Sequence, residues 1–171
     1  TSSEDKLIAS DAASYAYYGF SVGGAGDVNG DGYDDVIVGA YGDSDNGFNA
    51  GAAYVYEGAS TGISATSEEK LTASSGSSSD RMGVSVAGAG DVNGDGYDDV
   101  IVGASVANSR GAAYVYEGSA IGIIAASEDE LTASDAANND YYGISVASAG
   151  DVNGDGYDDV IVGAYLDDHS G

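Results

Sequence analysis

The chain has 171 residues, of which 43% are hydrophobic and 28 are glycine, so it can bury a core and must contain many turns. Its 29 acidic and 4 basic residues give a formal net charge of −25, so we expect no nucleic-acid partner. The absence of cysteine excludes disulfides, thiol catalysis and cysteine-type zinc sites, and without an apolar run of about 18 residues we expect no direct membrane insertion.

The first predicted element is a short strand over residues 4–10, EDKLIAS, which matches the last element of the repeats that follow. Next, an alternating run, YGFSVGGAG at 18–26, leads into the acidic loop DVNGDGYDD. The apolar run VIVGA, a polar loop and the alternating run GAAYVYEG follow, and both runs are typical of strands. EEKLTAS ends the unit as a fourth strand whose charges suit a sheet edge.

The same unit recurs along the chain, because Asp91 follows Asp27 by 64 residues and Asp151 follows Asp91 by 60. The four extra residues of the first copy lie in the loop between VIVGA and GAAYVYEG. Four short strands per unit, without a convincing helix, are typical of a propeller blade. We therefore predict an all-β fold of about three β-propeller blades, each of four antiparallel strands.

The predicted blades cover residues 18–74, 82–134 and, as a partial blade, 142–171, while residues 4–10 form the outer strand of a preceding blade. Three blades cannot close a ring, so the sequence predicts an incomplete or open propeller. Another chain could complete such a propeller. Three arrangements would cover its end faces: an excerpt from a longer propeller, an association of copies into a ring, or head-to-tail joining by strand complementation.

The loop DVNGDGYDD occurs three times without a substitution and predicts a calcium site in each copy, about three ions in all. Side chains at positions 1, 3, 5 and 9 and the carbonyl at position 7 offer only hard oxygen ligands, which favour Ca²⁺ over Mg²⁺. The predicted ligands are Asp27, Asn29, Asp31, Tyr33, Asp35, Asp91, Asn93, Asp95, Tyr97, Asp99, Asp151, Asn153, Asp155, Tyr157 and Asp159.

Two other interpretations compete with this calcium loop. The sequence NGDG alone makes a good turn, but a plain turn does not need three converging carboxylates. An EF-hand shares the first half of the loop but needs Glu at position 12 and a helix on each side. Position 12 is Val38, Val102 or Val162, inside runs typical of strands.

The repeats resemble the FG-GAP repeats of the integrin α-subunit β-propeller and its bacterial relatives. The FG position is held by Tyr18-Gly19, Met82-Gly83 and Tyr142-Gly143, and the GAP position by Gly39-Ala40-Tyr41, Gly103-Ala104-Ser105 and Gly163-Ala164-Tyr165. The resemblance implies blades with Ca²⁺ bound between the first and second strands. The chain departs from the family pattern in having no proline, and family propellers usually close with seven blades.

The sequence predicts no enzyme. Identical repeats give their carboxylates like environments, whereas acid–base catalysis needs two environments that differ. The single histidine, His169, lies near the end of the chain, and no nucleophile motif occurs. Tyr15, Tyr17 and Tyr18, which precede the first long strand, are expected to pack against the blades.

The function predicted first is a calcium-stabilised module for cell-surface adhesion or ligand binding, with a protein or glycan ligand at the cell surface. One alternative is a structural subunit of an extracellular fibre or sheath, in which copies of the chain form a homo-oligomer or filament. Another is an accessory propeller of a larger secreted hydrolase or lyase. We expect an extracellular or cell-surface location, because such loops saturate in calcium-rich fluid and not in resting cytosol.

Overall fold

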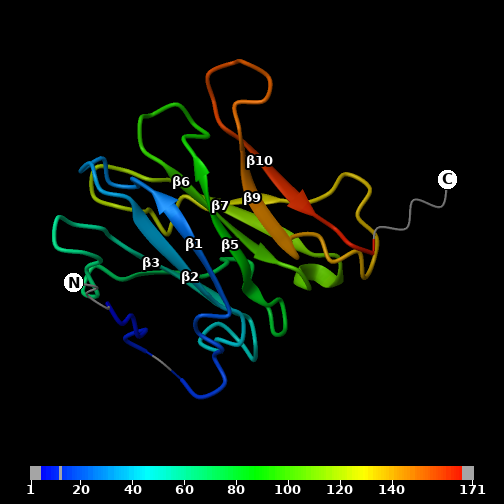
Figure 1. The fold of residues 1–171 in the computed structure, drawn as a ribbon. Coiled ribbons are helices and arrows are strands. Elements are labelled where there is room, and N and C mark those ends of the chain that lie inside the picture. Colours follow the sequence, from blue (N-terminus) through cyan, green and yellow to red (C-terminus); the bar gives the residue numbers. More distant parts are fainter. Residues whose placement is uncertain (1–4, 12, 167–171) are drawn as a thin grey trace.

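The computed structural model describes residues 5–11 and 13–166 as a row of antiparallel sheets (Figure 1). The strands are β1 (Ser21–Gly26), β2 (Asp35–Ala40), β3 (Ala52–Tyr56), β4 (Glu69–Leu71), β5 (Met82–Gly90), β6 (Asp99–Ala104), β7 (Ala112–Tyr116), β8 (Asp129–Leu131), β9 (Ser145–Gly150) and β10 (Asp159–Gly163), and a 3-10 turn, η1 (Ala107–Ser109), follows β6. The first blade is β1-β2-β3-β4, the second is β5-β6-β7-β8, and the partial blade is β9-β10. The predicted all-β fold of four-stranded antiparallel blades is confirmed, with no closed sheet among the described residues.

The two whole blades share one register. Val38 pairs with Tyr54 in the first blade, as Val102 pairs with Tyr114 in the second. The central strands β6 and β7 are buried along their whole length, which explains why their sequences are apolar on both faces. The outer strands β4 and β8 have only three residues each, since an outer strand pairs on one side only. No helix within the described ranges has the length and hydrophobicity needed to cross a bilayer.

Neighbouring blades stack face to face and bury a shared core. From the first blade this core contains Ile37 and Leu71, and both side chains are fully buried. From the second blade it contains Val86, Val102 and Tyr114. A second core joins the second blade to the partial blade in the same way. Burial between blades therefore stabilises the row, as expected for a repeat protein.

Glycines at the FG and GAP positions lie where two blades meet. A Cβ atom on Gly39 in β2 would collide with the carbonyl oxygen of Gly83, which begins the second blade. The hydroxyl of Ser21 donates a hydrogen bond of 2.8 Å to the same oxygen. Gly103 and Gly143 repeat this close approach at the next joint. Glycine at these positions allows the backbones of neighbouring blades to touch.

The strand predicted for residues 4–10 does not form over residues 5–10, and Glu4 lies outside the described residues. A strand needs a neighbouring strand to pair with, and none pairs with this segment among the described residues. The segment nevertheless covers part of the first blade, because Leu7 packs against its core. Ser10 donates hydrogen bonds to the Glu68 carboxylate from its backbone N–H at 3.0 Å and its hydroxyl at 2.6 Å.

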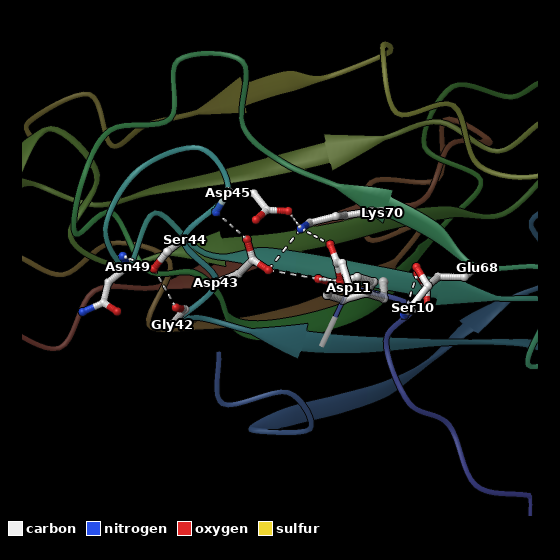
Figure 2. Close-up of polar contacts among 10 residues, drawn as sticks. Ser10, Asp11, Gly42, Asp43, Ser44, Asp45, Asn49, Glu68 and Lys70 are labelled. Atoms are coloured by element: carbon white, nitrogen blue, oxygen red, sulfur yellow. Dashed lines mark hydrogen bonds and ion pairs between the residues drawn. The ribbon is translucent and has the colours of Figure 1, made fainter. Parts of the chain in front are cut away.

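The longer loop of the first blade is held by a cluster of charges in which only Asp43 is buried (Figure 2). The ammonium of Lys70 in β4 contacts Asp11, Asp43 and Asp45 at 2.5, 3.1 and 2.7 Å. The hydroxyl of Tyr54 also donates to Asp11 at 2.8 Å and to Asp43 at 3.0 Å. Burial opposes ionisation of Asp11, but the bonds from Lys70 and Tyr54 outweigh it and hold the pKa of Asp11 below its usual value.

We predict that Lys70→Met destabilises the chain by about 1–3 kcal/mol, because it leaves three neighbouring carboxylates without a cation. Urea denaturation followed by circular dichroism measures the free energy of unfolding. Lys6→Met is the matched control, because Lys6 is exposed and its loss should change stability by less than about 0.5 kcal/mol. Equal stability of both variants would contradict the role assigned to Lys70.

Candidate metal centre

The three acidic loops connect the first strand of each blade to the second and lie along one edge of the row of sheets (Figure 1). A β-bulge precedes or follows each loop where β1, β5 and β9 end. Gly26, Gly90 and Gly150 stand at these strand ends with φ values of 79°, 77° and 68°. This left-handed conformation, which suits glycine, turns the chain out of the sheet and into the loop.

Side chains at positions 1, 3 and 5 fold inward in the first loop. The backbone N–H of Asp31 donates to Oδ1 of Asp27 at 3.0 Å and to Oδ1 of Asn29 at 2.9 Å. The N–H of Gly32 donates to Oδ2 of Asp27 at 2.8 Å, and that of Tyr33 donates to Oδ1 of Asp31 at 3.0 Å. These bonds gather the oxygens of three predicted ligands within one turn of the chain.

The other two loops repeat this geometry. The matching hydrogen bonds are 2.9–3.1 Å long and are accepted by Asp91, Asn93, Asp95, Asp151, Asn153 and Asp155. The three loops share these bonds because their sequences are identical and because each bond joins two groups of the same loop. The predicted residues at positions 1, 3 and 5 lie together in all three loops.

The aspartate at position 9 connects the loop to the strands of its blade by hydrogen bonds. Asp35 is fully buried and accepts hydrogen bonds from the N–H groups of Val28 at 2.8 Å and Gly58 at 2.7 Å. Asp99 makes the same two kinds of bond, while Asp159 accepts only the one within its loop. Position 9 therefore fixes the start of the second strand to the loop and, in the whole blades, to the end of the third strand.

Burial raises the pKa of Asp35 and raises that of Asp99 to about 6. Backbone N–H donors oppose the shift at both residues, while the neighbouring loop carboxylates add to it. At the exposed Asp151, by contrast, N–H donors led by that of Gly156 lower the pKa. Each whole blade therefore holds a buried carboxyl group whose ionised form would be stabilised by a nearby positive charge.

Position 8, to which the sequence analysis gave no role, joins consecutive loops. Asp98 accepts a hydrogen bond of 2.8 Å from the N–H of Asp27, and its own N–H donates to the Asp27 carbonyl at 3.2 Å. Asp158 and Asp91 form the same reciprocal pair at 3.1 and 3.0 Å. The two adjacent aspartates at positions 8 and 9 were the sequence feature that could have indicated this contact. Position 8 bonds to the neighbouring loop, whereas position 9 bonds within its own loop.

The tyrosine at position 7 also reaches the neighbouring loop. A Cβ atom on Gly30 would lie 2.8 Å from the ring of Tyr97, so this ring covers the preceding loop. Tyr157 covers Gly94 in the same way. The ring therefore serves the contact between loops, which leaves the backbone carbonyl as the predicted ligand atom.

The donor set fits a hard divalent cation. The loops offer carboxylate, amide and carbonyl oxygens and no nitrogen or sulfur ligand, which suits Ca²⁺. Positions 1, 3 and 5 would contribute the side chains that already point inward. An ion there would offset the repulsion between carboxylates, and the position 9 carboxylate keeps free lone pairs beside its hydrogen bonds.

A second acidic cluster has a different character. Within residues 5–11 and 13–166, the only three carboxylates that come within 4.8 Å of one another are those of Asp11, Asp43 and Asp45, so the aspartates at positions 1, 5 and 9 of the acidic loops do not converge as closely. Lys70 contacts all three and already supplies a positive charge, so we assign this cluster to the stability of the fold. His169 lies outside the described residues.

Exposed aromatic rings gather at the opposite end of the first blade from its acidic loop. Tyr17 stacks on Tyr41 with ring centroids 4.8 Å apart, and Phe20 meets Tyr41 edge-on at 4.6 Å. Together with Tyr15, which is 81% exposed, we call these rings the aromatic surface. The expected packing against the blades is wrong for Tyr15 and holds in part for Tyr17, which is half-exposed and stacks on Tyr41. It is right for Tyr18, which packs against Tyr54.

Comparison with known proteins gives one consistent family. Two profiles, both described as FG-GAP repeat, match residues 1–56 and residues 82–116 with 142–171. Integrin alpha-PS2 of Drosophila melanogaster is 33% identical over 164 residues, which cover 89% of this chain and 12% of the relative. Integrin alpha-4 of Xenopus laevis is 35% identical over 156 residues, which cover 90% of this chain and 15% of the relative.

Human integrin alpha-7 is 33% identical over 151 residues, which cover 88% of this chain and 12% of the relative. The chain thus spans between 12% and 15% of the length of these three relatives. The matched ranges contain the FG positions, the acidic loops and the GAP positions that the structure places at the joints between blades. The chain belongs to the FG-GAP repeat family, and its repeats are similar to those of integrin α-subunits.

Proposed function

We propose that the chain is a calcium-stabilised, non-catalytic module of an extracellular β-propeller that serves in adhesion or ligand binding. The observation that carries the proposal is the inward arrangement of oxygens at positions 1, 3 and 5 in all three loops. The repetition of this arrangement in three loops supports a role that every blade shares, and not one unique active site.

The proposed role of calcium is structural. An ion in each loop offsets the repulsion of its carboxylates and holds the turn between two central strands. Because position 8 ties each loop to its neighbour, an ordered loop also supports the joint between blades. Three ions would change the formal charge of the chain from −25 to −19. Binding free energy then adds to folding free energy.

An extracellular location follows from this role. Loops of this kind fill in calcium-rich fluid, whereas resting cytosol would leave them largely without the ion. The similarity to integrin α-subunits supports the same location and supports adhesion as the function. Since the chain covers a small part of those relatives, the ligand is inferred from this chain's own surface.

The aromatic surface is the proposed ligand contact. Rigid exposed aromatic rings are typical anchors of protein interfaces, and they also stack on the apolar faces of sugars. The exposed Asp45 lies on the loop that begins at Tyr41. This arrangement suits a protein or glycan ligand at the cell surface.

The first prediction from the proposed function is that calcium raises the melting temperature and a chelator lowers it. Each site held at about 100 times its Kd adds about 2.7 kcal/mol to the free energy of unfolding, so filling three sites should raise Tm by at least several degrees. Differential scanning calorimetry in calcium and in EDTA measures this shift, and Mg²⁺ at equal concentration should have a smaller effect. A Tm that is independent of calcium would contradict the proposal.

The second prediction concerns one loop. Asp91→Ala removes the position 1 ligand of the second loop and should reduce bound calcium from three ions per chain to two in equilibrium dialysis. Asp129→Ala is the matched control, because this aspartate is exposed and lies in β8, away from the loops. The control should keep three ions. If both variants bind the same number, Asp91 is not a ligand.

The third prediction concerns the aromatic surface. An array of immobilised polysaccharides and extracellular-matrix proteins, probed with the whole chain in calcium, identifies a ligand. The double substitution Tyr17→Ser and Tyr41→Ser should weaken binding to that ligand by about tenfold or more, as expected for interface anchors. Ile121→Ser replaces an exposed apolar residue elsewhere and should leave binding unchanged. Equal binding by both variants would place the ligand on another surface.

A further inference from the structure

The joint between the first and second blades shows which surfaces fit each other. Ile37 from the first blade is fully buried against the face that contains Val86, Val100 and Val102 of the second. Ile101 in turn is fully buried in the core shared by the second blade and the partial blade. The same isoleucine of each repeat therefore enters an apolar face of the blade that follows.

Both members of this contact recur on the two ends of the row, where no residue of the described part of the chain buries them. Ile161 of the partial blade corresponds to Ile37 and Ile101 but is 61% exposed. On the first blade, Val22 corresponds to Val86 and is 70% exposed, whereas Val86 is 8% exposed. Val22 lies in an apolar groove of about 420 Å³ that is also lined by Leu7, Val36, Val38 and Ile63.

The polar groups of the joint are also present at both ends. At the internal joints, Asp98 and Asp158 each pair reciprocally with the backbone of the preceding loop. The equivalent residue of the first blade is Asp34, and the backbone equivalent to Asp27 and Asp91 is that of Asp151. Among the described residues, no hydrogen-bond partner is found for the Asp34 carboxylate or for the Asp151 N–H.

A second polar contact follows the same rule. The hydroxyls of Ser21 and Ser85 donate to the carbonyl oxygens of Gly83 and Gly143 across the two internal joints, both at 2.8 Å. Ser145 is the third serine of this series, and within the described part of the chain its hydroxyl has no such acceptor. The carbonyl of Gly19 is the equivalent acceptor on the first blade.

We propose that two copies of the chain associate head to tail, with the free face of one copy's partial blade packed into the groove on the other copy's first blade. Ile161 then enters the groove beside Val22, Asp34 pairs with the Asp151 backbone, and Ser145 donates to the Gly19 carbonyl. The contact continues the internal joints with a second copy as the occupant. Its apolar part, Ile161 against Val22, involves no predicted calcium ligand, so this part of the contact does not rest on the proposed function.

A head-to-tail contact joins two different surfaces, the groove on one copy and the partial blade of the other. In a dimer, each copy therefore still has one of these two surfaces free. Blocking either surface with a charge should prevent association of that variant with itself. A copy blocked at one surface should still bind a copy blocked at the other. An association through two identical surfaces would not show this complementation.

The experiment is sedimentation equilibrium of the whole 171-residue chain over a range of concentrations, in calcium and moderate salt to screen the net charge of −25. The wild-type chain should show masses above the monomer value of 16.9 kDa that increase with concentration. Ile161→Asp alone and Val22→Asp alone should each remain at 16.9 kDa. An equimolar mixture of the two variants should form a dimer of twice that mass and nothing larger.

Two controls keep the test specific. Ile121→Asp places the same charge on an 88% exposed isoleucine outside both surfaces and should associate like the wild type. Circular dichroism should show that all variants are folded, since the substituted side chains are exposed. A wild-type chain that stays at 16.9 kDa, loss of association in Ile121→Asp, or a mixture that does not form the dimer would overturn the proposal.

Discussion

Repulsion between carboxylates is the interaction that the rest of this structure must accommodate. The repeated loops bring several aspartates into one short turn, and Asp35 and Asp99 are buried there as well. Backbone N–H groups offset part of this repulsion, because nearly every inward oxygen of the loops accepts a hydrogen bond from one of them. These donors are neutral, so they orient the carboxylates without removing their charge. The proposed cation in each loop would balance that charge, and the ammonium of Lys70 does so for the carboxylates of Asp11, Asp43 and Asp45.

The loops matter to the whole fold because they adjoin the joints between blades. A blade with two apolar faces depends on its neighbours for burial, so the row is as stable as its joints. Each joint combines an apolar contact, made by Ile37 or Ile101, with a polar one, made by Asp98 or Asp158 at the loops. The FG and GAP glycines lie in the same joint, where a side chain on Gly39 would push two backbones apart. The family pattern thus describes a contact between blades as much as a blade.

Much of the fold could be predicted from the sequence, because its main signals are local. The alternation in GAAYVYEG, the apolar run VIVGA and the repeat spacing gave the strands, their order and the blade count that the structure shows. The inward turn of positions 1, 3 and 5 was also local.

The segment at residues 4–10 was predicted as a strand from its likeness to β4, but strand formation depends on a neighbour that the sequence does not specify. The bond from Asp98 to Asp27 and the Lys70 cluster join residues far apart in the chain, and no local pattern signals such contacts. The exposure of Tyr15 was not indicated by its residue type, since aromatic residues more often pack in the interior.

The central claim is that each acidic loop is an oxygen cage for calcium, and anomalous diffraction from crystals grown in millimolar calcium tests it most directly. The account predicts one anomalous peak within each loop, ligated by the side chains at positions 1, 3, 5 and 9 and by the carbonyl of position 7, at the 2.3–2.6 Å typical of calcium. It also predicts that the cluster of Asp11, Asp43 and Asp45 keeps Lys70 and gives no peak. Ordered loops without an anomalous peak, or a peak only at that cluster with Lys70 displaced, would contradict it.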